Sequence, residues 1–318
     1  MKFEKYQHFL AKTLNKGIFD ANFPLEVRIE TVNACNSTCS FCPMNIYSEE
    51  TKNRNVVRMD KGLFEKIIKE LHDEKFDGEF KWYTENEPLL DRRLTEFVTY
   101  AKKEVPKVRR MQIDTNGLLL TEELGAGLIE AGINHLHIND YSKNGKGGIN
   151  HRKEKIKSIY DKLHLKFPDI KIVHRPRLLE EVLDSRGGHA PNNRLVLAES
   201  PKVSCVYPYY QFPITSNGNV GLCCVDTVFE EPLGNVNNNS IKSIWKSASY
   251  QNFREDLSLG KRNKKLCSQC TYTGHSPQMK HKILNKNTSA NLYSILSVPL
   301  VVKAKLNKLM GNTNTTFE

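Results

Sequence analysis

The chain has 318 residues, eight cysteines and a formal net charge of +11 at pH 7. A chain of this length can bury a large core, and eight cysteines are too few for a disulfide-stabilised scaffold of this size. The charge does not indicate a nucleic-acid partner, because residues 261–318 hold ten Lys and Arg residues against a single acid, Glu318, and so carry +9 of the +11.

The chain begins with a polar segment, residues 1–24, that we expect to be partly helical. Its first residues are not followed by the apolar region that a signal peptide has. No run of about 20 apolar residues occurs anywhere in the chain, so no membrane-spanning helix is expected. We therefore expect reduced thiols and a cytoplasmic location.

From residue 25 onward, strand-like and helix-like segments alternate, which is typical of βα units around a parallel sheet. Asp60 is expected to cap the first helix, beneath which apolar residues recur at helical spacing. The alternation predicts a partial α/β barrel of five or six strands over residues 25–200. The expected strands are 25–31, 79–83, 110–114, 135–139 and 170–174, and the expected helices are 61–74, 94–103, 121–131 and 153–166.

A stretch rich in Gly, Pro and Asn, residues 184–193, has the composition of a linker. It is expected to join the barrel to a smaller cysteine-containing module at residues 201–275. Beyond that module lies the basic tail, residues 276–318, whose apolar positions are mixed with lysines. The tail suits helices at an anionic lipid surface or on a partner, or equally a helix packed on the barrel with solvated lysines, followed by a disordered end.

Three cysteines, Cys35, Cys39 and Cys42, follow the first expected strand with the spacing CxxxCxxC. Three such thiolates can hold three irons of a [4Fe–4S] cluster and leave the fourth iron open for another ligand. The loop lies at the carboxyl end of a strand, where barrel-like α/β folds place their active sites. A zinc knuckle is the alternative, but zinc usually needs a fourth protein ligand, and no nearby histidine supplies one.

Four further cysteines follow a second pattern, Cx12Gx4C and then CxxC: Cys205, Cys223, Cys267 and Cys270. Residues 212–223 are expected to form a β-hairpin with an Asn217-Gly218 turn, which would bring its thiols together. Four thiolates suit either a Cys₄ zinc site or a saturated [4Fe–4S] cluster, and the spacing does not decide between them. Cys224 follows Cys223 on the expected strand, so we expect its side chain to face the other way and to pack in the core.

Taken together, the two cysteine patterns resemble the radical S-adenosylmethionine (SAM) superfamily with a SPASM/Twitch-type auxiliary module, over residues 25 to about 275. The resemblance implies a partial (β/α) radical SAM barrel followed by a small β-hairpin module. It also implies a SAM-binding [4Fe–4S] cluster on Cys35, Cys39 and Cys42, which cleaves SAM to methionine and a 5′-deoxyadenosyl radical. Because no cysteine follows Cys270, it implies one auxiliary [4Fe–4S] cluster, on Cys205, Cys223, Cys267 and Cys270. A reductant such as flavodoxin or ferredoxin would supply the electron.

The resemblance extends to residues that would contact SAM. The family has an aromatic residue before the last cysteine of the triplet, here Phe41, and a Gly-Gly-Glu-Pro-like stretch whose second half matches Asn86-Glu87-Pro88, whereas Thr84 and Glu85 replace the glycines. Glu87 could instead cap the following helix, and polar residues at strand ends are common in any βα turn. The other SAM-binding residues that the resemblance implies are Asn116, Asn139 and Asp140.

An aminocyclitol dehydrogenase type of radical SAM enzyme has a similar second cysteine pattern, so the leading hypothesis is oxidation of a secondary alcohol on a small sugar- or cyclitol-like substrate. A base must then assist ketone formation, and Arg186, Glu85 and His174 are the candidates. Arg175 and Arg177, after the fifth expected strand, could recognise an anion on the substrate.

Three alternatives stay open at this point. One is a peptide-modifying enzyme, against which the short segment before Cys35 counts. Another is an epimerase that uses Cys224 as a hydrogen-atom donor. The third is a zinc-stabilised interaction module with a basic arm, which would require the CxxxCxxC spacing to be accidental.

Overall fold

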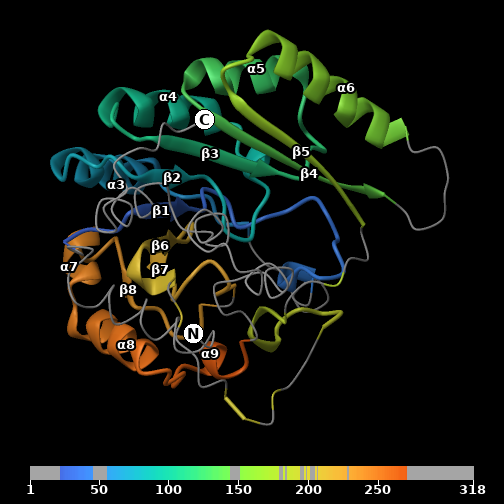
Figure 1. Ribbon diagram of the computed structural model, residues 1–318. Coiled ribbons are helices and arrows are strands. Elements are labelled where there is room, and N and C mark those ends of the chain that lie inside the picture. The colour runs from blue at the N-terminus through green and yellow to red at the C-terminus, as the bar shows by residue number, and fades with distance from the viewer. Residues whose placement is uncertain are drawn as a thin grey trace, which may run out of the picture.

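The centre of the molecule is an eight-stranded sheet with the order β5-β4-β3-β2-β1-β6-β7-β8 (Figure 1). This computed structural model describes residues 22–45, 56–143, 151–178, 182, 185–193, 197, 199–200, 205, 207–227 and 229–270. Neighbouring strands from β5 to β6 pair in parallel, and the β6–β7 and β7–β8 pairs are antiparallel. The strands are β1 Glu26–Ile29, β2 Glu79–Lys81, β3 Arg110–Thr115, β4 His135–Lys143, β5 Lys171–Leu178, β6 Gln211–Ile214, β7 Asn219–Val220 and β8 Gly234–Asn235.

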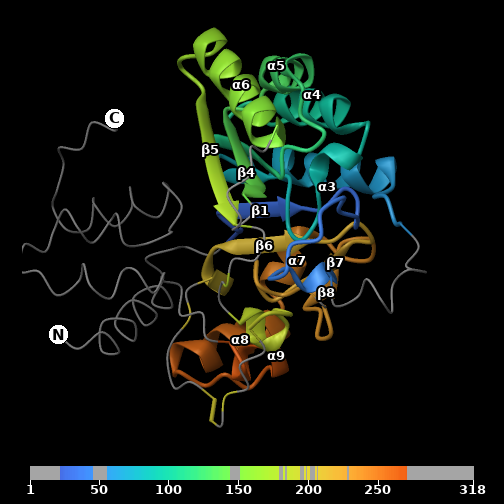
Figure 2. The ribbon, with the colours of Figure 1, turned by 90° about the vertical axis from the view of Figure 1, so that its right-hand side faces the viewer.

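Four helices alternate with the first five strands and lie along one side of the sheet (Figures 1 and 2). The Asp60 side chain caps the first of them by accepting hydrogen bonds from Gly62 N and Leu63 N, as the sequence predicts. The apolar side of that helix is buried, and its Phe64 stacks on Phe97 with ring centroids 4.1 Å apart. The helices are α3 Lys61–Asp73, α4 Leu94–Glu104, α5 Glu122–Ala131 and α6 His151–Lys166.

The last two strands of the barrel run further than the sequence predicts. Instead of ending at Asn139 and His174, β4 and β5 continue to pair through Asn139–Arg175 and Lys143–Leu178. The polar residues at these positions have the composition of a turn, but main-chain pairing between the two strands continues past them. This extension places Asn139 and Arg175 side by side.

The predicted β-hairpin is confirmed, and its position in the sheet is new. β6 and β7 pair antiparallel around a turn in which Gly218 has a φ of +85° and donates its N–H to Thr215 O. β6 also pairs in parallel with β1, from Glu26–Gln211 to Ile29–Ile214. The cysteine-containing module is therefore built onto the edge of the barrel sheet, and the parallel part of that sheet runs from β5 to β6.

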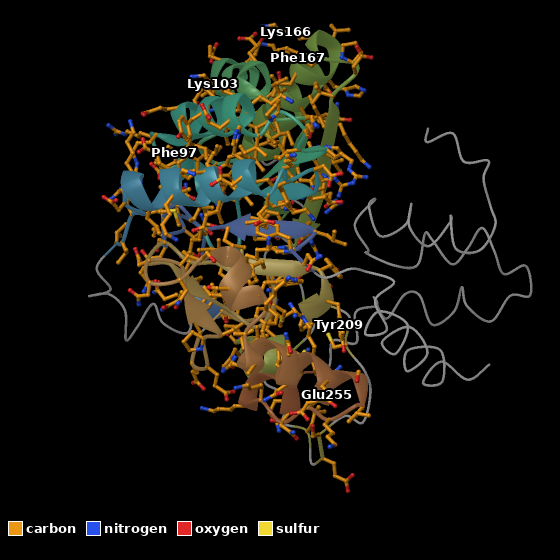
Figure 3. The ribbon with its side chains drawn as sticks, turned by 90° about the vertical axis from the view of Figure 1, so that its left-hand side faces the viewer. Phe97, Lys103, Lys166, Phe167, Tyr209 and Glu255 are labelled. Atoms are coloured by element: carbon orange, nitrogen blue, oxygen red, sulfur yellow. The ribbon has the colours of Figure 1, made fainter. Side chains whose placement is uncertain are left out.

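Short helices complete the C-terminal part beyond β8: α7 Ile241–Trp245, α8 Ala248–Ser258 and α9 Lys265–Ser268. They lie at the opposite end of the molecule from α5 and α6. Figure 3 shows the same separation, with Tyr209 and Glu255 at one end and Lys166 and Phe167 at the other. None of the helices described is long and apolar enough to cross a membrane. The expected lead-in helix, the 184 end of the linker and the whole basic tail lie outside the described residues.

The inner face of the parallel strands carries a chain of buried ion pairs. Glu26 pairs with Arg28 and Lys81, and Glu79 pairs with Lys81 and Arg110. Burial alone would raise the pKa of Glu26, but Arg28 and Lys81 hold it at about 2. The alternating residues Val27 and Ile29 belong to the apolar core, so each strand separates an apolar side from a charged interior.

Candidate active site

A cavity of about 260 Å³ opens at the carboxyl ends of the parallel strands. The loop after β1 contributes the cysteine triplet, and the loop after β2 contributes Glu85 and Glu87. The short 3-10 turn η4, Arg186–Gly188, closes it from the linker side. Its lining includes Cys35, Ser37, Cys39, Phe41, Cys42, Tyr83, Thr84, Glu85, Asn86, Glu87, Asp114, Thr115, Asn116, Asn139, Tyr141, Arg175, Arg177 and Arg186.

The triplet loop is anchored to the loops after β2 and β3. Glu87 N donates to Ala34 O at 2.9 Å, and Asn116 Nδ2 donates to Asn36 Oδ1 at 2.8 Å and to Cys35 Sγ at 3.7 Å. Burial raises the pKa of Cys35 to about 11, and the nearby Glu87 adds to the effect. A metal ion reverses this preference, because a coordinated thiol loses its proton. The three thiols line one cavity, which is the arrangement a cluster with an open iron needs.

The Glu87 carboxylate joins the loops after β2 and β3. It accepts hydrogen bonds from Thr115 Oγ1 at 2.7 Å, Asn116 N at 2.7 Å and Leu89 N at 3.1 Å. The hydrogen bond from Leu89 N caps the 3-10 turn η3, Pro88–Leu90. The alternative that Glu87 caps the following helix is therefore correct for one of its three contacts. Burial outweighs these hydrogen bonds and raises the pKa of Glu87 to about 7. Its oxygens are occupied by protein donors that fix the shape of the cavity floor.

Two asparagines present buried polar atoms that have no partner among the described residues. They are Asn86 Nδ2 and Asn139 Oδ1. Unpartnered buried polar atoms are costly in a finished fold and mark places where a ligand completes the hydrogen bonding. Together they offer one donor and one acceptor to the cavity, which fits a ligand with an amine and a carboxylate, such as SAM.

Phe41 also reaches the cavity, where its ring lies 5.2 Å from that of Tyr141. Asp140 and His174, in contrast, lie outside the cavity. Asp140 is fully buried, with its Oδ2 3.1 Å from His174 Nε2, and neither residue lines the cavity. Of the three candidate bases, only Arg186 and Glu85 are in the site.

Arg186 and Glu85 form an ion pair across the cavity. Arg186 Nη1 lies 2.6 Å from Glu85 Oε1, and the Cys42 thiol donates to Glu85 Oε2 at 3.7 Å. Arg186 has a φ of +48°, a conformation that is uncommon for a residue with a side chain and that clusters at functional sites. Glu85, which stands where the family resemblance has a glycine, thus holds Arg186 beside the triplet.

Cys224 does not lie on a strand, so that part of the sequence prediction is wrong. It is half-buried in the turn after β7, where its N–H donates to Gln211 Oε1 at 3.3 Å. The charges that act on its thiol are those of Arg28, Glu26, Arg186 and Glu85. Cys224 packs against the apolar core, as expected from the sequence, and is not among the residues that line the cavity.

The second set of thiols gathers in the C-terminal part. Cys205, Cys223, Cys267 and Cys270 are each buried, with at most 9 % exposure. Burial raises the pKa of Cys223, and repulsion from Cys224 and the other three thiols adds to it, so the thiols are close neighbours. Four neighbouring thiols fit a [4Fe–4S] cluster, in which each thiolate binds a different iron.

Family models match both parts of the chain: the radical SAM superfamily at residues 29–140 and the SPASM iron–sulfur cluster-binding domain at residues 205–271. A SAM-dependent 2-deoxy-scyllo-inosamine dehydrogenase of Niallia circulans is 29 % identical over 77 % of this chain and 91 % of its own length. The crystal structure of BtrN in complex with AdoMet and 2-DOIA superposes with a TM-score of 0.65 at 28 % identity, covering 79 % of this chain and 94 % of that one. The anSMEcpe structure with bound AdoMet, with a TM-score of 0.53 and 14 % identity over 90 % of this chain and 96 % of that one, shares the fold.

The chain belongs to the radical SAM superfamily and carries a SPASM domain. It is a radical SAM enzyme. Its radical SAM domain binds a [4Fe–4S] cluster and SAM, and its SPASM domain binds auxiliary iron–sulfur clusters. Within that class it is a homologue of the SAM-dependent 2-deoxy-scyllo-inosamine dehydrogenase.

Some residues of the site were not among those selected from the sequence. Tyr83, Asp114 and Tyr141 line the cavity, and each stands at or just past the end of an expected strand. That position was a usable signal, because parallel strands bring their carboxyl ends to one edge. The charged interior formed by Glu26, Arg28 and their partners also went unpredicted, although alternating charged residues in a strand indicate a polar inner face.

Proposed function

We propose that this chain is a SAM-dependent dehydrogenase that oxidises a secondary alcohol of a small polyol or cyclitol-like substrate. In this proposal Cys35, Cys39 and Cys42 hold the SAM cluster, and Cys205, Cys223, Cys267 and Cys270 hold a single auxiliary [4Fe–4S] cluster. The observation that carries it is the Arg186–Glu85 pair, which lies in the same cavity as the triplet. The homology to a dehydrogenase over nearly all of that enzyme's length supports the choice of reaction.

When bound, the cluster and SAM supply a 5′-deoxyadenosyl radical that takes a hydrogen atom from carbon, and an auxiliary cluster supplies an electron acceptor. The chain must hold the substrate hydroxyl and accept its proton. Arg186 Nη1 is 2.6 Å from Glu85 Oε1, so a hydroxyl oxygen that accepts a hydrogen bond from the guanidinium lies beside a carboxylate. In this proposal Glu85 receives the hydroxyl proton, and Arg186 orients the hydroxyl oxygen.

Two further parts of the proposal concern partners. A small acidic electron carrier such as flavodoxin or ferredoxin would reduce the triplet cluster, whose Cys35 is exposed. The basic tail would contact an anionic lipid surface. Removal of residues 281–318 should then abolish binding to anionic vesicles, and a full-length chain that never binds them would end the membrane proposal.

The reaction is tested by anaerobic reconstitution with iron and sulfide, followed by dithionite, SAM and a panel of polyols. About eight irons per chain are expected for two [4Fe–4S] clusters. The expected product is lighter than its substrate by two hydrogens and appears together with 5′-deoxyadenosine. Loss of 5′-deoxyadenosine formation in the triplet variant Cys35→Ala/Cys39→Ala/Cys42→Ala is the control. A product of unchanged mass would contradict the dehydrogenase assignment.

Epimerisation is the second candidate, with Cys224 as the hydrogen-atom donor. The charges of Arg186 and Glu85 both act on the Cys224 thiol, and in this proposal that thiol would return a hydrogen atom to a substrate held by the pair. An epimerase would leave the substrate mass unchanged in water and incorporate one deuterium from heavy water. Full activity in the variant Cys224→Ala would exclude Cys224 as the donor.

A further inference from the structure

A buried guanidinium lies beside the auxiliary thiols. Arg262 is 4 % exposed, and its Nη1 donates to Cys270 O, the peptide oxygen of one of the four cysteines, at 3.2 Å. The thiols of that set are buried as well. Charges in such an environment are screened far less than charges at the surface, so the positive charge of Arg262 acts on the auxiliary site.

The charge of Arg262 opposes the negative charge that gathers at these thiols. Burial raises the pKa of the Cys267 thiol, and repulsion from Cys205 and Cys270 adds to that effect, whereas Arg262 acts in the opposite sense and favours the thiolate. The Asp226 carboxylate acts in the same sense as the other thiols, but less strongly than Arg262. A guanidinium keeps its proton at any ordinary pH, so Arg262 is a fixed positive charge at this site.

Other cations of the same module have contacts that explain them structurally. Lys264 pairs with Glu231 at 3.3 Å. Arg254 is also buried, but its guanidinium carbon lies 3.8 Å from the centroid of the Trp245 ring, and its Nη1 donates to Trp245 O at 2.9 Å. These two side chains hold the helices and loops of the module together, whereas Arg262 contacts the main chain of a proposed cluster ligand.

The acceptor role of the auxiliary site gives a nearby positive charge a function. When a hydrogen atom leaves the alcohol carbon and the hydroxyl proton leaves the oxygen, one electron must be taken up as the C=O double bond forms. A cluster on four thiolates is an anion that gains one more negative charge when it takes this electron. A fixed positive charge beside it stabilises the reduced state more than the oxidised state, and so raises the reduction potential.

We propose that Arg262 raises the reduction potential of the auxiliary cluster and thereby favours uptake of the electron that substrate oxidation leaves. This proposal rests on the proposed function, which assigns the auxiliary cluster to the four cysteines and the acceptor role to that cluster. Arg262 is not among the residues that line the candidate cavity. It is therefore a positioning residue that acts through its charge on the cluster, and not a residue that binds substrate.

The test isolates the auxiliary cluster in the full-length triplet variant Cys35→Ala/Cys39→Ala/Cys42→Ala, reconstituted anaerobically to about four irons per chain. A redox titration followed by EPR spectroscopy measures the ratio of reduced to oxidised cluster at each potential. Arg262→Gln, added to this variant, should lower that ratio at a fixed potential by about tenfold or more, which is about 59 mV for one electron. Arg262→Lys keeps the positive charge and should stay within about threefold of the parent.

Lys261→Gln is the matched control, because it removes the same charge from the neighbouring, exposed position and should leave the ratio unchanged. If Arg262→Gln holds fewer irons than its parent, Arg262→Met, which buries no polar group, is titrated in its place. An unchanged ratio in the variant that keeps the cluster overturns the proposal. So does an equal fall in Arg262→Lys, or loss of the cluster from both neutral variants, because either result would show that the side chain acts through structure.

Failure of the proposed function has different signatures. A triplet variant that binds no iron would reject the assignment of the auxiliary cluster to the four cysteines, and the role of Arg262 with it. A lower potential in Arg262→Gln, combined with no two-hydrogen oxidation of any polyol by the wild-type chain, would leave Arg262 as the residue that sets the potential and reject the dehydrogenase assignment alone.

Discussion

At the scale of single residues, Glu87 matters more for the shape of the cavity than a family resemblance suggests. Its two oxygens accept three hydrogen bonds from two loops. A glutamine keeps only one accepting oxygen and turns an amide donor toward at least one of those donors. Leaving buried donors unsatisfied costs about 1–3 kcal/mol, so Glu87→Gln should lower the free energy of unfolding by that amount and weaken SAM binding.

Urea unfolding and SAM titration of the reconstituted protein measure the two effects of Glu87→Gln. Glu130→Gln serves as the control, because Glu130 is exposed on α5 and pairs with the exposed Lys166 at 3.4 Å. Surface changes of this kind stay within about 0.5 kcal/mol. Wild-type stability in Glu87→Gln would show that the three hydrogen bonds contribute nothing net.

His135, at the start of β4, provides a pH prediction. Burial lowers its pKa to about 3, and the positive charges of Arg110 and Lys171 add to the effect. An unfolded histidine titrates near pH 6.5, so between about pH 6.5 and 3 the unfolded chain binds a proton that the folded chain refuses. The stability from neutral His135 is therefore complete above pH 6.5 and is lost progressively as the pH falls toward 3.

The substitution His135→Gln should remove part of this acid sensitivity. Relative to wild type, the variant should lose about 1 kcal/mol less stability between pH 7.5 and pH 5.5. Denaturant midpoints at the two pH values, with cluster content held equal, measure the difference. His72→Gln, on the exposed side of α3, is the matched control and should follow the wild-type pH dependence. Parallel curves for His135→Gln and wild type would contradict the assignment.

At the scale of elements, the 3-10 turn η4 and the helix α9 act as one unit. Gly187 has a φ of +65°, and a Cβ there would lie 2.3 Å from Leu266 Cδ1 and 2.9 Å from Leu266 O. Ser185 Oγ also donates to Gln269 O at 3.3 Å. Leu266 precedes Cys267 and Gln269 precedes Cys270, so the segment that carries Arg186 packs on the chain neighbours of the two CxxC cysteines.

Gly187→Ala should therefore affect both sites. The added methyl must push α9 away and strain the backbone, at about 1–3 kcal/mol. We expect about four irons per chain rather than about eight, and a fall in substrate turnover as Arg186 moves. Gly127→Ala in α5 is the control, because a Cβ there meets nothing within 4 Å and should stabilise the helix slightly. Full iron content in Gly187→Ala would contradict the idea that η4 and α9 act as one unit.

The helices and strands were largely predictable from the sequence, but the pairing between strands that are far apart in the chain was not. The first five strands and four helices follow from local periodicity, caps such as Asp60 and turns such as Asn116-Gly117, which are properties of neighbouring residues. The pairing of β6 with β1 joins residues about 185 apart, and no local pattern encodes such a contact. For the same reason the triplet and the CxxC were readable as metal-binding spacings, whereas the Arg186–Glu85 pair depends on a contact across 101 positions.

At the scale of the whole molecule, the continuous sheet explains how two metal centres can serve one cavity. β1 leads into the SAM triplet on one side, and β6, its parallel neighbour, leads into the hairpin that carries Cys223. Beneath these two strands, Glu26 forms ion pairs with Arg28 and Lys81. Buried charges, rather than an apolar core, therefore lie on that face of the strands. The loops that carry the triplet, Glu87 and Asn116 follow β1, β2 and β3, while Arg186 lies on η4, which packs against α9.

This division predicts that the two centres can be separated by mutation. Cys267→Ala/Cys270→Ala should leave about four irons per chain and keep the SAM affinity within about threefold of wild type, because Glu87 and Asn116 are held by hydrogen bonds among the loops after β1, β2 and β3. Substrate oxidation should be lost, since Arg186 loses the packing that sets its position and the electron acceptor is gone. The triplet variant should show the reverse pattern, with about four irons and no SAM cleavage. If the CxxC variant lost SAM binding as completely as the triplet variant does, the SAM site would depend on the auxiliary module. In that case the effect would have to pass through the pairing of β1 with β6.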